Sequence, residues 1–208
     1  MESYVGQVGS VFQNPKTQYF NADSTDELAF PCENTGMSPA RIRQRVHDVA
    51  EPFHIRPLLG RRIMTLSGGQ KQQLAVAAST MLAPGLIVMD EPTAMLDPVG
   101  RREVLKTVHK LRKQKKVTVI LITHYMEEVV DADKIFVMDH GKVVMEGSPK
   151  EIFSKVDELK SYRLDVPQVT ILADELRKRG LDIPKGILRK EELVEAVERL
   201  TSENGEKK

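Results

Sequence analysis

The sequence predicts an α/β protein with a parallel sheet, a helical subdomain and a small helical C-terminal appendage. Two short apolar runs, Leu86 to Met89 and Val117 to Ile122, have the composition of strands buried on both faces, as parallel sheets require. Between them, an apolar stripe at helical spacing runs from Val104 to Leu111. A strand, a helix and a second strand in this order predict a parallel crossover.

The N-terminal part adds one strand and several helices. Val8 to Phe12 is a short strand-like run that ends where Asn14 and Pro15 favour a loop. Ser24 and Glu27 have the spacing of a capping box and predict a helix through Phe30. Further helices are expected from Ser38-Pro39 and over Gln70 to Ala83. We expect a helical subdomain over about residues 22–80.

The C-terminal part predicts a hairpin followed by an appendage. Two strand-like runs flank His140-Gly141, and a glycine suits the turn of a hairpin. Gly147-Ser148-Pro149 then marks a boundary. The predicted organisation is a domain over residues 1–149, an appendage over residues 150–201 with helices at 169–179 and 190–200, and a disordered tail over residues 202–208.

Composition narrows the classes of function. The 31 basic and 30 acidic residues leave a formal net charge of +1, so no overall field draws the chain to nucleic acid. No apolar run approaches the roughly 20 residues of a spanning helix. The first residues show neither the basic n-region nor the apolar h-region of a signal peptide, and the single cysteine excludes an internal disulfide. We therefore expect a cytoplasmic protein. The five histidines lack metal-ligand spacing, so any metal is expected to be Mg²⁺ carried by a nucleotide.

The strongest motif is Leu66-Ser67-Gly68-Gly69-Gln70, directly before a predicted helix. Ser67 offers a hydroxyl, and two glycines let backbone N–H groups approach an anion at a helix N-terminus, where the dipole is positive. The alternative is an ordinary serine N-cap with a glycine turn. The motif predicts a surface that faces phosphate.

A second motif places Asp90 and Glu91 at the end of the strand Leu86 to Met89. Open α/β sheets bind ligands at the carboxyl ends of their strands. Asp90 is suited to holding Mg²⁺ through its water shell, and Glu91 to polarising the water that attacks a γ-phosphate. A solvated strand end is the alternative.

Three further residues are candidates by position. Asp97 follows a proline-bearing loop and could equally be the N-cap of the next helix. His124 follows the second strand, and we expect it at the same sheet edge, in contact with the γ-phosphate. Gln13, at the end of the first strand, could orient water or bind Mg²⁺.

The order of these motifs resembles an ATP-binding cassette (ABC) ATPase, a P-loop NTPase-type fold, from its glutamine loop onward over about residues 5–150. The resemblance implies ATP and Mg²⁺ as ligands. It makes Gln13 the loop coupled to the membrane partner, Ser67 to Gln70 the signature, Asp90 and Glu91 the Walker B aspartate and catalytic base, Asp97 a dimer-contacting residue and His124 the switch histidine.

Finer details are similar to the ATPases of energy-coupling factor transporters. These are Val11 to Pro15 followed by Tyr19-Phe20, the loop Ala94 to Pro98, and the region after Pro149. The resemblance implies a peripheral subunit on the cytoplasmic face of the membrane that powers uptake of a vitamin or a transition-metal ion. Its implied partners are a second ATPase subunit, a transmembrane coupling component that contacts Gln13 to Phe20, and a substrate-binding membrane protein, with no nucleic acid.

The 208 residues contain no G-x-x-x-x-G-K-[ST] motif, the P-loop that cradles nucleotide phosphates. We expect a truncated reading frame or a late start codon ahead of Gln13, or a subunit that completes an intact partner's ATP site. A non-catalytic remnant is a third possibility. Two other classes of ATPase fit this sequence less well. A DNA-repair or chromosome-organising ATPase would carry long coiled coils before the signature, and a translation-associated protein would carry two cassettes, whereas these 208 residues show neither feature.

Overall fold

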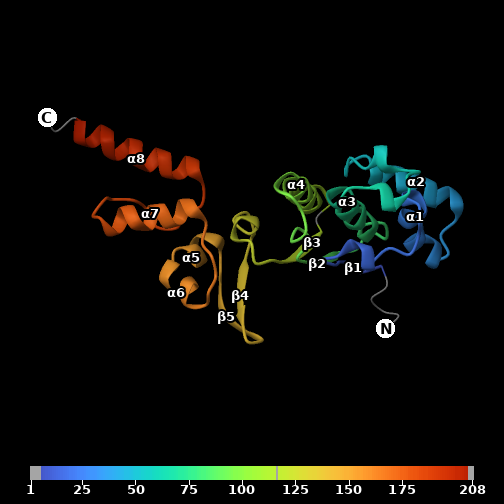
Figure 1. Ribbon diagram of the computed structural model, residues 1–208, viewed down its shortest axis with the longest axis horizontal. Helices are drawn as coiled ribbons and strands as arrows, with labels where there is room; N and C mark the ends of the chain where they lie inside the picture. The colour runs from blue at the N-terminus through green and yellow to red at the C-terminus, as the bar shows by residue number, and fades with distance from the viewer. Residues whose placement is uncertain (1–5, 116, 206–208) are drawn as a thin grey trace. The chain divides into compact units, whose positions relative to one another are not determined.

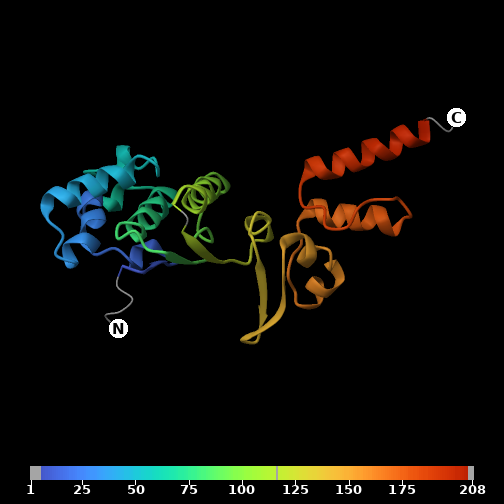
Figure 2. The same cartoon turned by 180° about the vertical axis from the view of Figure 1, so that it is seen from behind.

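The structure is a computed structural model that describes residues 6–115 and 117–205. Two compact units divide it: the first ends at Thr123 and the second begins at His124 (Figures 1 and 2). The sequence predicted a domain boundary at residue 149 from a glycine-proline turn. The two compact units instead divide earlier, between Thr123 and His124, before the hairpin.

The first unit is built on a three-stranded parallel sheet. Its strands are β1 (Val8–Val11), β2 (Leu86–Asp90) and β3 (Thr118–Ile122), in the order β1-β2-β3. Val11 pairs with Met89, which pairs with Leu121, so all three strands end at the same edge. The predicted parallel crossover from β2 to β3 is confirmed.

The prediction that these strands are buried on both faces is wrong for the described residues. Ile87 and Met89 of β2 are fully buried, but Leu86 and Val88 between them are only partly buried. On β3, Ile120 and Ile122 are each 48% exposed. Alternating burial means that one face of the sheet packs against helices while the other is open. An apolar run does not distinguish these cases, because β-branched residues favour strands of both kinds.

Helices α3 (Gly68–Ser79) and α4 (Pro98–Lys115) lie on the same side of the sheet (Figures 1 and 2). Helix α3 contacts β1 and α4, and α4 contacts β3. Helices α1 (Ser24–Asn34) and α2 (Pro39–Ala50) pack on each other, and α1 also packs on α3. Short 3-10 turns connect these elements: η2 (Pro15–Thr17), η3 (Arg56–Leu58) and η4 (Ile63–Thr65).

The predicted capping box at Ser24 and Glu27 is wrong. The N-cap of α1 is Asp23, whose carboxylate accepts a hydrogen bond from the Thr25 N–H at 2.7 Å. The Ser24 hydroxyl is buried and donates to the Leu58 carbonyl at 2.6 Å, while the Glu27 carboxylate accepts from the backbone N–H groups of Phe20 and Asn21. Contacts with residues outside the helix therefore take up the side chains of Ser24 and Glu27 in place of the local capping box.

The second unit contains the predicted hairpin. Strands β4 (Ile135–Asp139) and β5 (Lys142–Gly147) are antiparallel, and His140 and Gly141 at the turn have φ of 45° and 76°. Two positive φ values in a two-residue turn match the right-handed twist of the strands. The remaining elements are η5 (Met126–Glu128), α5 (Pro149–Phe153), α6 (Val156–Ser161), α7 (Gln168–Lys178) and α8 (Lys190–Gly205).

Two small cores hold the second unit together. Phe153 and Leu159 are fully buried beside the hairpin residues Val137 and Met145. Helices α7 and α8 pack on each other around a separate cluster that includes Ile183. Helix α8 continues to Gly205, so the part of the predicted disordered tail that the structure describes is helical; residues 206–208 lie outside the described residues.

Candidate nucleotide site

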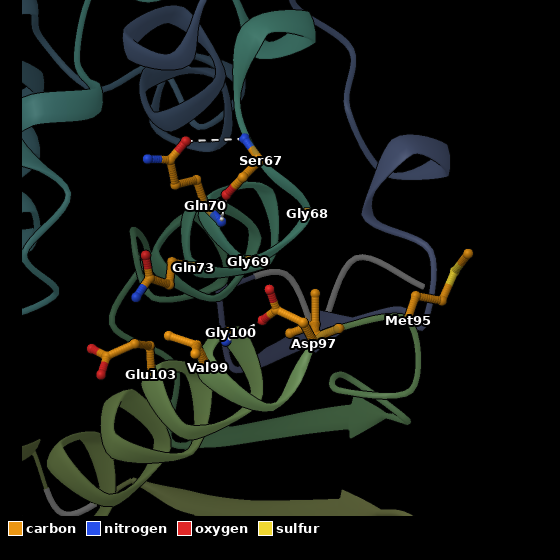
Figure 3. A pocket seen from close by; sticks show the side chains of 11 residues that line it. Ser67, Gly68, Gly69, Gln70, Gln73, Met95, Asp97, Val99, Gly100 and Glu103 are labelled. Atoms are coloured by element: carbon orange, nitrogen blue, oxygen red, sulfur yellow. Dashed lines mark hydrogen bonds between the residues drawn. The ribbon is translucent and has the colours of Figure 1, made fainter.

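The signature segment forms the start of α3. Ser67 is the N-cap: its hydroxyl oxygen accepts a hydrogen bond from the Gln70 N–H at 3.2 Å, and its own N–H donates to Gln70 Oε1 at 3.0 Å (Figure 3). This is a reciprocal capping box. Ser67 is therefore the N-cap of α3. The first turn, which contains Gly68 and Gly69, lies at the positive end of the helix dipole.

A hollow of about 390 Å³ lies between the first turns of α3 and α4 (Figure 3). It brings Asp97 to the signature segment, although the remainder of α3 and the whole of β2 separate the two in the sequence. Its lining comprises Ser67, Gly68, Gly69, Gln70, Gln73, Met95, Leu96, Asp97, Val99, Gly100 and Glu103.

Two glycines allow the N-termini of α3 and α4 to lie close together. A Cβ on Gly69 would lie 3.2 Å from the Gly100 Cα, tighter than ordinary van der Waals contact. Asp97 caps α4 at the same place, because its Oδ1 accepts a hydrogen bond from the Gly100 N–H at 2.7 Å. Asp97 is thus a helix cap and a lining residue of the hollow at once.

Sequence reasoning missed several lining residues, among them Glu103. Asp97, Gly100 and Glu103 follow one another at intervals of three residues, which places them on one face of the N-terminal part of α4. This spacing could have indicated from the sequence that Glu103 lies beside Asp97. The Lys106 ammonium donates a 2.8 Å hydrogen bond to Glu103 and holds the pKa of that carboxyl below its usual range. The hollow is therefore bordered by carboxylate groups as well as by a helix N-terminus.

Asp90 and Glu91 lie at the carboxyl edge of the sheet. Asp90 is the exposed last residue of β2, and the Glu91 N–H donates to the Ile122 carbonyl at 2.9 Å. Glu91 has φ of 44°, a left-handed conformation that is costly for a residue with a side chain and that clusters at functional sites. Its Oε2 accepts a 2.7 Å hydrogen bond from Gln13 Nε2. The structure thus brings Gln13 and Glu91 together.

His124 begins the second unit, directly after Thr123, the last residue of the first. Its ring packs against that of Tyr125 with 4.2 Å between centroids. The expected position of His124 beside the two carboxylates stays a prediction.

Comparisons with known proteins give the family. The profile of the family described as "ABC transporter" matches residues 1–94. The energy-coupling factor transporter ATP-binding protein EcfA1 of Caldanaerobacter subterraneus subsp. tengcongensis is 53% identical over 91% of this chain and 68% of its own length. EcfA1 of Clostridium perfringens is 49% identical over 92% of this chain and 68% of its own.

A solved structure supports the same fold. CbiO1 from Clostridium perfringens, described as part of the ABC transporter complex CbiONQ, superimposes with a TM-score of 0.69 and 32% identity. The match covers 81% of this chain and 68% of that one. The parallel sheet with helices and these matches define an ATPase of the ABC type. The chain belongs to the family of energy-coupling factor transporter ATP-binding proteins. As such it is an ATP-binding subunit of an ABC importer.

Within the part of the chain that the structure describes, no helix is both long enough and apolar enough to cross a membrane.

Proposed function

We propose that the chain is the ATP-hydrolysing subunit of an energy-coupling factor importer and powers uptake of a vitamin or a transition-metal ion through a membrane partner. The hollow that joins the signature segment to Asp97 carries this proposal, because it lies at the N-terminus of α3, where backbone N–H groups can bind phosphate. Ser67, Gly68, Gly69, Gln70 and Asp97 contact the nucleotide there. The similarity to EcfA1 proteins and to CbiO1 supports the transporter assignment.

The sheet edge supplies the hydrolytic groups. Glu91 polarises the attacking water. Gln13, which already donates a hydrogen bond to Glu91, orients that water. His124 contacts the γ-phosphate in this proposal. The strained backbone of Glu91 supports its assignment, since such conformations persist where the surrounding structure holds them for function.

Asp90 and Gln13 are the proposed holders of Mg²⁺. The described residues contain no group of three or more acidic, histidine or cysteine side chains able to hold a metal. Such a sparse donor set fits Mg²⁺, which is usually held by one or two protein oxygens together with nucleotide phosphates and water. When bound, the ion neutralises charge on the phosphates.

The hollow needs a second subunit to bind ATP. Asp97 and Glu103 carry negative charge beside it, and an anionic nucleotide requires cations or many N–H donors to offset that repulsion. The 208 residues contain no P-loop motif, so the P-loop that holds the nucleotide comes from outside them. We propose a second ABC ATPase subunit opposite this surface.

The membrane component docks near Gln13 to Phe20. Phe20 is 77% exposed and stacks on Phe30 of α1 with 5.1 Å between ring centroids. Phe30 is half-buried, so the exposed ring of Phe20 rests on a supported base, and an exposed aromatic side chain of this kind is typical of an interface anchor. The chain then lies at the cytoplasmic face of the membrane, beside a coupling component and a substrate-binding membrane protein.

The test is ATP turnover by the chain mixed with an intact partner ATPase and the membrane component. We expect turnover that depends on this chain and falls when Ser67 is replaced by alanine. Turnover and nucleotide binding that are identical with and without the chain would instead support the alternative, a non-catalytic remnant.

A further inference from the structure

The buried side chain of Gln72 joins the signature helix to the segment that carries Gln13. Gln72 lies on α3 two residues after Gln70, is 1% exposed, and its Nε2 donates a 3.2 Å hydrogen bond to the Phe12 carbonyl. Phe12 directly precedes Gln13. We propose that Gln72 is a positioning residue that sets the place of Gln13 and makes it follow movements of the signature helix. This inference rests on the proposed function, in which Gln13 and the signature both act on ATP.

The Phe12 carbonyl needs a partner because the sheet has ended. The β1–β2 ladder stops at Val11 and Met89, so the Phe12 peptide groups lie beyond it. The Phe12 N–H donates to Gln18 Oε1 at 3.2 Å, and Gln18 Nε2 donates to the Ser10 carbonyl at 3.0 Å. The amide of Gln18 therefore holds the N–H of Phe12, and Gln72 holds its carbonyl. The backbone entering Gln13 is fixed from both sides.

A second tie runs from the same turn of α3. The Tyr19 hydroxyl donates a hydrogen bond to the carbonyl of Lys71, the residue before Gln72. A tyrosine hydroxyl is protonated at neutral pH and so can donate, and burial raises the pKa of Tyr19 further. Adjacent residues of α3 thus hold both ends of the segment from Phe12 to Tyr19, with Gln13 inside it.

The segment between these ties is itself ordered. The Asn14 side chain accepts from the Lys16 N–H at 3.1 Å, and the Asn14 carbonyl accepts from Thr17 Oγ1 at 2.8 Å. A segment held internally and tied at both ends moves as one piece with the helix. The 2.7 Å hydrogen bond from Gln13 to Glu91 is at the end of this connection, so a shift of the signature turn reaches the sheet edge through Gln72.

A buried glutamine could also serve only to satisfy a carbonyl, and the test has to separate the two roles. Gln72→Met keeps a similar side-chain length and removes the donor. Gln44→Met is the matched control: Gln44 is an exposed glutamine on α2 whose Nε2 donates to Asp48 at 2.8 Å, away from this segment. Urea denaturation of both variants measures the purely structural cost.

The specific readouts are the Gln13 side-chain amide resonances in the full chain and ATP hydrolysis by the complete transporter complex. We expect Gln72→Met to shift the Gln13 amide signals and speed their hydrogen exchange, and to lower kcat by about 10- to 100-fold while KM for ATP changes less than about twofold, as misplacement of a reacting group does. Gln44→Met leaves both unchanged.

Unchanged Gln13 signals in a folded Gln72→Met variant would overturn the proposal, as would a rise in KM with kcat preserved. The proposed function fails differently. If Gln72→Met moves the Gln13 signals but Gln13→Ala retains full kcat, Gln72 positions Gln13 as proposed and Gln13 has no part in hydrolysis.

Discussion

The side-chain amide of Gln13 lies 2.7 Å from a carboxylate oxygen of Glu91, 78 residues further along the chain. The parallel register of β1 and β2 produces this contact, because it places the ends of both strands at one edge. A carboxylate that accepts a hydrogen bond from a neutral amide gains a defined orientation. Such an arrangement suits a general base, which must be oriented toward the attacking water.

Glu91→Gln tests the role of this carboxylate. The amide is nearly isosteric and can still accept a hydrogen bond from Gln13, so we expect unchanged stability. Loss of a general base lowers kcat by about 10²- to 10⁴-fold. The measurement is steady-state ATP hydrolysis by the assembled transporter. Glu51→Gln, at a carboxylate that pairs with Arg56 on the surface, is the control, and comparable rates for the two variants would contradict the assignment.

Gly69→Ala tests the approach of the two helix starts. The new Cβ would lie 3.2 Å from the Gly100 Cα, and backbone cannot yield as a flexible side chain can. We expect a loss of about 1 to 3 kcal/mol in the free energy of unfolding, as for other overpacked sites, together with loss of partner-dependent turnover. Gly85→Ala is the matched control, because a Cβ there meets nothing within 4 Å. Equal stability of the two variants, measured in urea, would argue against tight packing.

Ser67→Ala and Ser148→Ala form a matched pair, because both serines belong to reciprocal capping boxes. Loss of a serine N-cap costs about 0.5 to 2 kcal/mol of stability, and we expect both variants to unfold more easily. Only Ser67→Ala should reduce ATP turnover in the assembled complex, since only that hydroxyl lines the hollow. A similar effect of both on turnover would reduce Ser67 to a structural cap.

Phe20→Asp tests the docking of the membrane component. Phe20 is largely exposed, so a charge there should leave the fold intact and prevent co-purification with the coupling component. Met64→Asp, at a methionine that is 80% exposed elsewhere in the same unit, is the control. Tyr19 is less informative, because its hydroxyl is bound to α3 and a charge there would disturb the fold. Normal assembly of Phe20→Asp would exclude this docking surface.

Asp174→Asn tests an ion pair in the second unit. A hydrogen bond from the Lys178 ammonium at 2.9 Å lowers the pKa of Asp174 below its usual value of about 3.9. A lowered folded-state pKa stabilises the protein above the unfolded-state pKa, and this stabilisation is lost as the pH falls through the folded-state pKa. The variant should therefore be less stable than the parent chain at pH 7, with the difference shrinking below about pH 4.

Asp157→Asn is the control for this pair. Asp157 also contacts Lys178, at 3.5 Å, but its side chain is 81% exposed, and exposed pairs contribute little. Urea denaturation at pH 7 and at pH 3 measures both variants. A difference between Asp174→Asn and the parent chain that does not change with pH would show that the ionised pair is not its source.

Local patterns were sufficient for much of the fold. The apolar runs predicted the strands β2 and β3, the periodicity from Val104 to Leu111 predicted α4, and His140-Gly141 predicted the hairpin turn. These features depend on residues that are close in the sequence. The N-cap role of Ser67 was predicted as an alternative to phosphate contact, and the structure shows the cap itself.

The exceptions are places where a distant contact competes with a local one. Ser24 has the spacing of a cap, but the Leu58 carbonyl takes its hydroxyl, and Asp23 becomes the cap instead. The hydrogen bond from Gln72 to the Phe12 carbonyl could not be predicted either. A buried glutamine is visible in sequence only as a polar residue on an amphipathic helix.

By itself, the sequence determined which residues are candidates for the chemistry and most of the segments that form helices and strands, because side-chain type and periodicity act over a few residues. The tertiary structure decided which of those residues meet. Parallel register brought Gln13 to Glu91, and the small volume of Gly69 and Gly100 let the signature reach Asp97. Those contacts depend on packing between segments far apart in the chain, and local propensity carries no information about such distances.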